Sequence, residues 1–210
     1  MLSQGRVSLR RWRRDDAAAL LSAVVESHEH LRPWMPWADG YDEDRAAEYL
    51  RDCDAQWASG SAFAYAIVVG DHIVGSAGLH KRVGDGALEI GYWVHADWTG
   101  HGIATDAAAA LTAAAIALPG VDRVEIHHDA ANLASGRIPA KLGYARLGQR
   151  PARDLWPRAP GETGTDLVWQ FTPSRARRLR ISSTRSRRPQ PGPATRAEDG
   201  LTGRNPAAGS

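Results

Sequence analysis

The sequence is nearly without cysteine and has no long apolar run. Cys53 is the single cysteine among 210 residues, so an intrachain disulfide is impossible and a disulfide-built secreted scaffold is excluded. No stretch of about 18 uninterrupted apolar residues occurs, so we expect no transmembrane helix and no membrane partner. The arginine-rich N-terminus has no apolar run behind it and is unlike a signal peptide. These absences predict a soluble protein of the reducing cytoplasm.

The small net charge of +2 is unevenly distributed along the chain. Nine of the 26 basic residues but only two of the 24 acidic ones follow residue 172, so residues 173–210 carry +7 and residues 1–172 carry −5. The last 38 residues are rich in Arg, Pro, Ser and Gly and have no periodicity, a composition that cannot bury enough apolar surface to become ordered. We therefore predict a globular domain over residues 1–172 and a disordered tail over residues 173–210. The arginines of the tail would contact RNA or ribosomal surfaces weakly, or the tail is solvated without a specific partner.

Hydrophobic periodicity predicts an α/β chain of the α+β kind. Alternating apolar residues predict strands near 6–12, 62–69, 73–79, 88–94, 123–128, 144–149 and 167–171. Apolar residues at helical spacing predict helices over about 15–25, 42–59, 103–118 and 135–142. This order of elements predicts a mixed sheet of about six to seven strands flanked by about four helices.

The segment that follows the strand near 88–94 has the features of a phosphate-binding loop. It reads Thr99-Gly-His-Gly-Ile-Ala-Thr105 and leads into an alanine-rich helix, whose first N–H groups have no intrahelical partner and attract anions. A P-loop nucleotidase requires a lysine that this loop lacks. A dinucleotide-binding fingerprint requires a third glycine where Thr105 stands, and it should open a parallel β-α-β domain. Both of these assignments fail on the residues present.

The loop resembles the acetyl-CoA loop of the GNAT N-acetyltransferase superfamily, Gln/Arg-x-x-Gly-x-Gly/Ala, with Thr99 at the first position. The segment from Asn132-Leu-Ala-Ser135 to Lys141-Leu-Gly-Tyr144 resembles the Asn-x-x-Ser…Lys-Leu-Gly-Phe segment of that superfamily. With Leu31-Arg-Pro-Trp-Met-Pro-Trp37 and Glu89-Ile-Gly-Tyr-Trp93, the chain is similar to the RimJ/RimL branch. The resemblance implies a GNAT fold with a twisted, mostly antiparallel sheet. It also implies acetyl transfer to a primary amine, with acetyl-CoA as co-substrate and no metal.

The resemblance does not fix the acceptor. Members of the RimJ/RimL branch acetylate the α-amino group of ribosomal proteins, which favours a protein N-terminus; a small amine or an antibiotic is the alternative. A protein of a different class, a non-catalytic acyl-CoA-binding sensor, would need only the loop. Because no persuasive nucleophile is present, direct attack of the amine is favoured over an acyl-enzyme route. The acyl-chain length and the oligomeric state, including a homodimer, stay open.

Two residues are predicted to be catalytic. Glu89 would deprotonate the amine, since burial among apolar strand residues would raise its pKa; the alternative is a structural ion pair with an arginine. His80, His127 and His128 are rival bases. Ser135 matches the position whose hydroxyl protonates the departing thiolate in the family, although it would also serve as a helix N-cap.

The remaining candidates would bind the two substrates. The resemblance assigns the acetyl-CoA pyrophosphate to the backbone of Thr99, Gly100, His101, Gly102, Ile103, Ala104 and Thr105. It assigns the thioester carbonyl to N–H groups near Trp93 and Val94, and the pantetheine or phosphate arm to Asn132, which would otherwise form an Asx-type turn. Trp34, Met35 and Trp37 would wall an apolar acceptor pocket, or would pack in the core.

Overall fold

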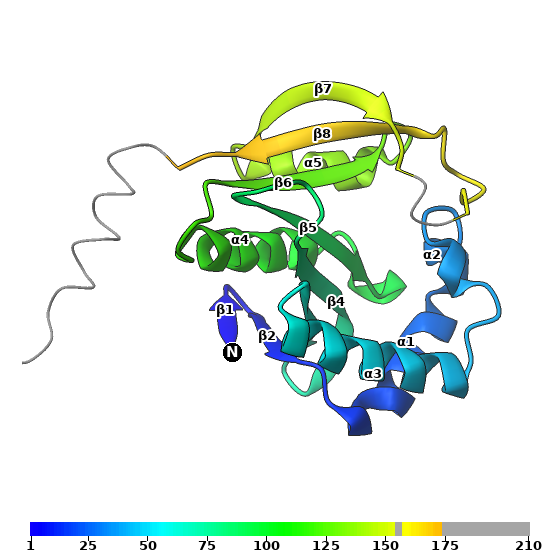
Figure 1. The fold of residues 1–210 in the computed structure, drawn as a ribbon. Helices are drawn as coiled ribbons and strands as arrows, with labels where there is room; N and C mark the ends of the chain where they lie inside the picture. The colour runs from blue at the N-terminus through cyan, green and yellow to red at the C-terminus, as the bar shows by residue number, and fades with distance from the viewer. Residues whose placement is uncertain (154–156, 174–210) are drawn as a thin grey trace, which may run out of the picture. The chain divides into compact units, whose positions relative to one another are not determined.

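Eight strands form one sheet in the computed structural model, which describes residues 1–153 and 157–173 (Figure 1). Their order across the sheet is β1-β2-β3-β4-β5-β6-β8-β7, and every neighbouring pair is antiparallel except the parallel pair β5 and β6. The predicted mixed, mostly antiparallel sheet is confirmed, with one strand more than expected. The strands are β1 (Leu2–Gln4), β2 (Val7–Arg11), β3 (Ala62–Val69), β4 (His72–His80), β5 (Ala87–Val94), β6 (Arg123–Asp129), β7 (Ala145–Pro151) and β8 (Thr165–Phe171).

Five α-helices and three short 3-10 helices connect the strands within the described residues. The α-helices are α1 (Ala17–Glu26), α2 (His28–Leu31), α3 (Glu43–Ser59), α4 (Ile103–Ile116) and α5 (Leu133–Lys141); the 3-10 helices are η1 (Arg14–Asp16), η2 (Pro36–Ala38) and η3 (Ala96–Trp98). α2 is a single turn that the sequence pattern did not predict. In the part of the chain that the structure describes, no helix is long and apolar enough to cross a membrane. The predicted tail lies outside the described residues apart from its first residue, Pro173.

The helices cover both faces of the sheet and divide the core in two (Figure 1). On one face, Ala107, Ala108 and Leu111 of α4 pack against Leu79 and Ile90, where the small alanines let the helix approach the strands closely. On the other face, a second cluster contains residues of α1, α3 and the alternate side of β3. A cleft lies on this second face of the sheet, beyond the part that α1 and α3 cover.

The strands β5 and β6 pair only over their first residues. Their register runs from Ala87↔Arg123 to Ile90↔Ile126, although β5 continues to Val94 and β6 to Asp129. β6 remains paired with β8 along its length, so β5 is the strand that loses a neighbour. Backbone groups of residues 91–93 that face β6 therefore have no strand partner, and a gap opens in the sheet.

Candidate active site

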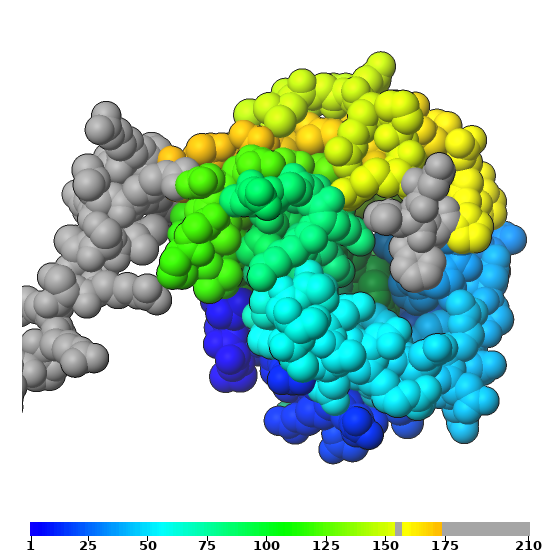
Figure 2. Space-filling model, viewed as in Figure 1, coloured from blue at the N-terminus to red at the C-terminus, as the bar shows by residue number. Residues whose placement is uncertain are grey.

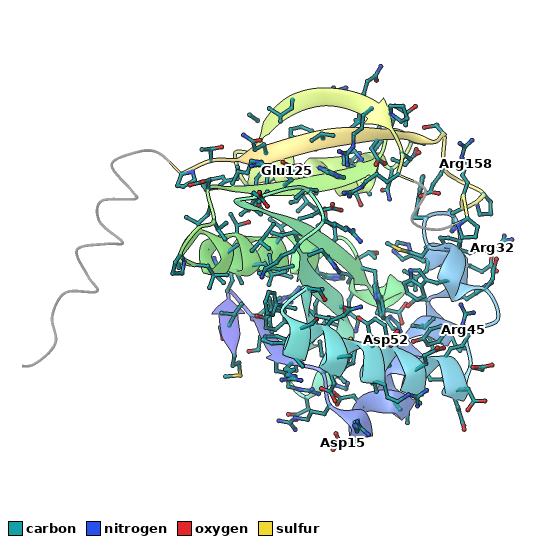
Figure 3. All side chains as sticks on the ribbon, in the orientation of Figure 1. Asp15, Arg32, Arg45, Asp52, Glu125 and Arg158 are labelled. Carbon is teal, nitrogen blue, oxygen red and sulfur yellow. The ribbon has the colours of Figure 1, made fainter. Side chains whose placement is uncertain are left out.

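A cleft with a volume of about 620 Å³ lies over the gap between β5 and β6. Trp34, Trp37 and Tyr49 line one side, and Arg153 and Arg158 line the other. Figure 2 shows this hollow between the N-terminal helices, in blue and cyan, and the yellow segment that precedes β8. Figure 3 shows Arg158 on that segment, on the side of the molecule where Arg32 ends α2. The volume of the cleft lies in the range usual for small-molecule and cofactor sites.

The two sides of the cleft meet at one rim. The N–H of Gly161 donates to the carbonyl oxygen of Pro33 at 2.9 Å, and a Cβ on Gly161 would lie only 2.7 Å from that oxygen, so glycine is required there. Asp129 holds the same segment, because its Oδ2 accepts the N–H groups of Thr163 and Gly164 at 2.9 Å each. Burial disfavours the charge of Asp129, but these donors outweigh burial and lower its pKa. The rim thus joins the α2 region to the end of β6.

A row of titratable side chains lies on the sheet face that carries the cleft, and two of them, His80 and Glu89, line the cleft itself. His80 on β4, Glu89 on β5 and Glu125 on β6 occupy paired register positions, so their side chains lie on the same face of the sheet. Figure 3 shows Glu125 at the strand that continues this row. On the same face of the sheet, the pair next to His80 and Glu89 is Gly78 with Gly91. Because neither glycine has a side chain, this pair leaves space in the floor of the cleft.

Glu89 is buried and held by two arginines. Its side chain is 5% exposed; Arg82 Nη2 donates to Oε1 at 2.8 Å, and Arg153 Nη2 donates to Oε2. Burial alone would raise the pKa of Glu89, but the hydrogen bonds and charges of the arginines outweigh it and hold the pKa at about 2. The expectation that the pKa of Glu89 is raised is therefore wrong. At neutral pH this carboxylate is charged and both of its oxygens are engaged.

The ring nitrogens of His127 and His128 are also engaged. Arg150 Nη2 lies 2.7 Å from His127 Nδ1, which must accept because a guanidinium can only donate; His127 Nε2 then donates to Glu125 Oε2 at 2.8 Å. Burial lowers the pKa of His127. The indole N–H of Trp169 donates to His128 Nε2 at 3.0 Å, and His128 Nδ1 donates to the carbonyl oxygen of Asp129 at 2.8 Å. Both assignments follow from the hydrogen-bond network and leave both rings neutral.

His80 is different from the other two cleft histidines. Neither of its ring nitrogens has a hydrogen-bond partner among the described residues. Its Nε2 lies 3.3 Å from the position of a Cβ on Gly78 and 3.5 Å from that of a Cβ on Gly91, so the ring lies over the glycine pair. Burial, reinforced by repulsion from Arg82 and Arg153, lowers the pKa of His80 to about 4.

The start of α5 brings Asn132 and Ser135 to the far side of the gap. Asn132 is the N-cap residue, and its Oδ1 accepts the N–H of Ser135, three residues on, at 3.1 Å. This is a helix-capping bond and not the expected Asx-type turn, which would reach only two residues on. The alternative of Ser135 as the N-cap is therefore wrong, and its hydroxyl is not used as a cap. Tyr92 of β5, a residue the sequence reasoning missed, donates its hydroxyl to the carbonyl oxygen of Ser135 at 3.3 Å. Ser135, Asn132 and Tyr92 all line the cleft.

The glycine loop takes the conformation that an anion-binding turn requires. Gly100 and Gly102 have φ angles of 73° and 81°, in the left-handed region, and Gly102 is the N-cap of α4. Within the part of the chain that the structure describes, no side chain caps α4, so the N–H groups of its first turn have no side-chain partner there. These donors and the helix dipole fit a pyrophosphate. Thr99 instead donates both its hydroxyl, at 2.8 Å, and its backbone N–H, at 3.1 Å, to the carbonyl oxygen of Ala96. In this conformation, neither donor of Thr99 is free for a phosphate, unlike the backbone donors at the start of α4.

The predicted acceptor wall is in the cleft and is also packed. Trp34, Met35 and Trp37 all line the cleft, and Met35 and Trp37 pack at the edge of the second core cluster. Trp37 lies with its ring 6.0 Å from that of Trp93, the β5 residue that the family resemblance assigns to the thioester. Val94, the other residue of that pair, is buried and does not line the cleft. Among the described residues, no group of His, Cys, Asp or Glu is arranged to hold a metal ion.

The loop, the gap beside β5 and the cleft together have the arrangement of an acyl-CoA-dependent transferase. The sequence model for the acetyltransferase (GNAT) domain matches residues 6–145, more than half of the chain. The protein belongs to this GNAT acetyltransferase family. A comparison with curated proteins finds no match for this sequence.

Solved structures with the same fold include acetyltransferases with different acceptors. The microcin C7 self-immunity acetyltransferase MccE, bound to acetyl-CoA and AMP, has a TM-score of 0.73 at 16% identity, over 80% of this chain and 92% of that one. RimL, a ribosomal L7/L12 α-N-protein acetyltransferase bound to coenzyme A, also scores 0.73 at 16% identity, over 82% and 98%. Mycobacterium smegmatis RimJ with a CoA disulfide scores 0.71 at 24% identity, over 87% and 91%. At these identities the likeness is one of fold, and it does not choose the acceptor.

Proposed function

We propose that this protein is an acetyl-CoA-dependent N-acetyltransferase in which a primary amine attacks the thioester directly. The observation that carries the proposal is the arrangement along β5. The strand runs from the charged floor of the cleft past the gap, and the chain then reaches the open N-terminus of α4. A pyrophosphate at α4 would let the pantetheine arm reach along the gap to the cleft.

The chemistry needs one proton acceptor, one oxyanion site and one proton donor. The amine loses a proton and its nitrogen bonds to the thioester carbon; the C–S bond then breaks and the thiolate takes a proton. Unpaired N–H groups near Trp93 would stabilise the oxyanion. The Ser135 hydroxyl, free of a capping role, supports its assignment as the donor to the thiolate.

The acceptor we favour is the α-amino group of a protein N-terminus. A cleft of about 620 Å³, lined from two sides, suits an extended peptide end, and RimL and RimJ share the fold. A small amine or antibiotic is the second candidate, supported by the equal TM-score of MccE. A sensor without catalysis is the third, and it would not need the charged floor of the cleft.

The experiment is release of free thiol from acetyl-CoA with a panel of N-terminal peptides and small amines. Turnover of peptides above small amines supports the first acceptor class, and the reverse order supports the second. Measurable acetyl-CoA binding with no turnover of any acceptor would refute catalysis and leave the sensor. Mass spectrometry of the peptide product locates the acetyl group on the α-amino nitrogen or elsewhere.

The predicted role of Glu89 as the base is opposed by its two arginines, because a proton on the carboxylate would remove the charge that pairs with Arg82 and Arg153. The variant Glu89→Gln tests that role. If Glu89 is the base, this variant should turn over slowly and bind acetyl-CoA with nearly unchanged affinity. Equal loss of both would show that Glu89 shapes the site instead of reacting in it.

Fewer structural observations support the proposals for the partners and the cellular location of the protein. A homodimer stays a prediction that sedimentation would test. Weak RNA contact through the tail would appear as binding that falls steeply with salt. The single, buried Cys53 supports activity in a reducing cytoplasm.

A further inference from the structure

We propose that His80 is the catalytic base, and that it takes the proton of the acceptor amine directly or through one water. The inference rests on the proposed N-acetyltransferase activity and names a residue of the same cleft. Three observations carry it: the ring nitrogens of His80 have no hydrogen-bond partner among the described residues, His80 lies on the floor of the cleft, and the rival bases are engaged in hydrogen bonds.

Each carboxylate oxygen or ring nitrogen of the rival bases already takes part in a hydrogen bond. Glu89 accepts from two arginines, and His127 and His128 use both ring nitrogens in hydrogen bonds. Asp129 accepts N–H groups from Thr163 and Gly164 with one oxygen and from Ala131 with the other. For His127 or His128 to act as a base, an existing hydrogen bond must break, and a proton on Glu89 would remove the charge that pairs with two arginines. His80 needs no such change.

The strand pattern explains why His80 faces the cleft. Side chains alternate along β4, so Ser76, Gly78 and His80 share the face on which the cleft lies. A side chain at Gly78 or Gly91 would occupy the space into which the imidazole extends. Because Gly78 and Gly91 have no side chains, the imidazole of His80 can lie close to the backbone of β4 and β5. The part of the cleft above the ring is then left for the acceptor.

The surroundings of His80 keep its imidazole ring unprotonated. The groups that face it are Glu89 on β5, Arg82 after β4 and Arg153 after β7, two cations against one anion. Burial and these cations lower the pKa of His80 to about 4, so the ring is neutral at physiological pH. The same cations would lower the pKa of a bound ammonium, which reduces the energy gap for proton transfer.

Every proton of the reaction has a destination. His80 takes one proton from the acceptor ammonium, and the neutral amine attacks the thioester carbon. As the C–N bond forms and the C–S bond breaks, the nitrogen loses a second proton and the thiolate gains one from the Ser135 hydroxyl. The proton from nitrogen restores Ser135, and His80 releases its proton to water.

The test compares His80→Gln with a matched control, His72→Gln, on the exposed beginning of the same strand. General base catalysis is worth about 10²–10⁴-fold, so His80→Gln should lower kcat at least about 100-fold with the KM for acetyl-CoA within about twofold. The kcat of this variant should rise about tenfold per pH unit toward the pKa of the amine, while the wild type levels off at lower pH. His72→Gln should match the wild type.

A second variant distinguishes a catalytic role of His80 from a structural one. His80→Ala should regain activity when imidazole is added, in proportion to the neutral imidazole present, which a purely structural loss would not do. Full activity in His80→Gln, or no rescue of a folded His80→Ala that binds acetyl-CoA, would overturn the assignment. No turnover by the wild type with any acceptor would instead refute the proposed function.

Discussion

At the scale of single residues, the behaviour of Glu89 depends on two side chains that are far from it in sequence or outside its strand. Arg82 is seven positions earlier and Arg153 is 64 positions later, and both reach the same carboxylate. The sequence placed Glu89 correctly in a strand and left two alternatives, a pKa raised by burial and an ion pair with an unidentified arginine; the structure shows ion pairs with two arginines. No periodicity reports which distant arginine turns inward, so the direction of the pKa could not be predicted.

Replacing Glu89 should destabilise the protein at neutral pH. The pKa of Glu89 falls from 4.5 to about 2 on folding, so its charge stabilises the folded state above pH 4.5, and this contribution is lost as pH falls toward 2. Each unit of pKa is worth about 1.4 kcal/mol, so Glu89→Gln should cost roughly 3 kcal/mol at pH 7. Urea unfolding of both proteins at pH 7 and pH 3 measures the difference, which should shrink at the lower pH. A constant difference would contradict this account.

Gly102 should matter for acetyl-CoA binding through its backbone alone. Nothing lies within 4 Å of the position of a Cβ on Gly102, so Gly102→Ala changes no packing, but alanine disfavours the φ of 81° by about 1–2 kcal/mol. We expect acetyl-CoA to bind about tenfold more weakly, measured by calorimetry. Gly40→Ala is the control, because it has a φ of 62°, open space and no place in the cleft. Equal affinities in the two variants would show that the loop does not hold the cofactor.

At the scale of elements, strands and helices of several turns were predictable and the shortest elements were not. The predicted strand over 62–69 and the helix over 42–59 agree with β3 and with α3 and its cap. β1 has three residues and α2 has four, too few for alternation or helical spacing to appear. The end of pairing between β5 and β6 was also beyond the sequence pattern, because the sequence of a strand does not report where it separates from its neighbour.

Asn132 should have two separable effects. It caps α5 through Ser135, so Asn132→Ala should cost about 1 kcal/mol of stability, and its place in the cleft predicts weaker acetyl-CoA binding as well. Asp42→Ala is the matched control, since Asp42 caps α3 through Arg45 at 2.9 Å and is not in the cleft. Thermal unfolding and acetyl-CoA titration of both variants give the comparison. Loss of affinity in both would assign the effect to helix stability.

At the scale of the whole molecule, residues 173–210 should be dispensable for the chemistry. All cleft-lining residues lie between Trp34 and Asp166, before the predicted tail. A chain that ends at residue 172 should keep the melting temperature and the turnover of small amines of the full chain. Lower turnover of a protein acceptor alone would show that the tail recruits that acceptor. A fall in turnover of small amines would contradict the predicted domain boundary.

The position of β8 between β6 and β7 has a consequence for a chain as it is being synthesised. The glycine loop, the α5 cap and the whole of β6 precede residue 142, but Arg153 and the rim residue Gly161 come later, and β8 must then insert beside β6. A nascent chain stopped near residue 150 therefore contains the residues proposed to hold acetyl-CoA but lacks one wall of the proposed acceptor cleft and one partner of Glu89. On that proposal, the cofactor site is translated before the acceptor site is complete, and the acceptor site waits for the last strand.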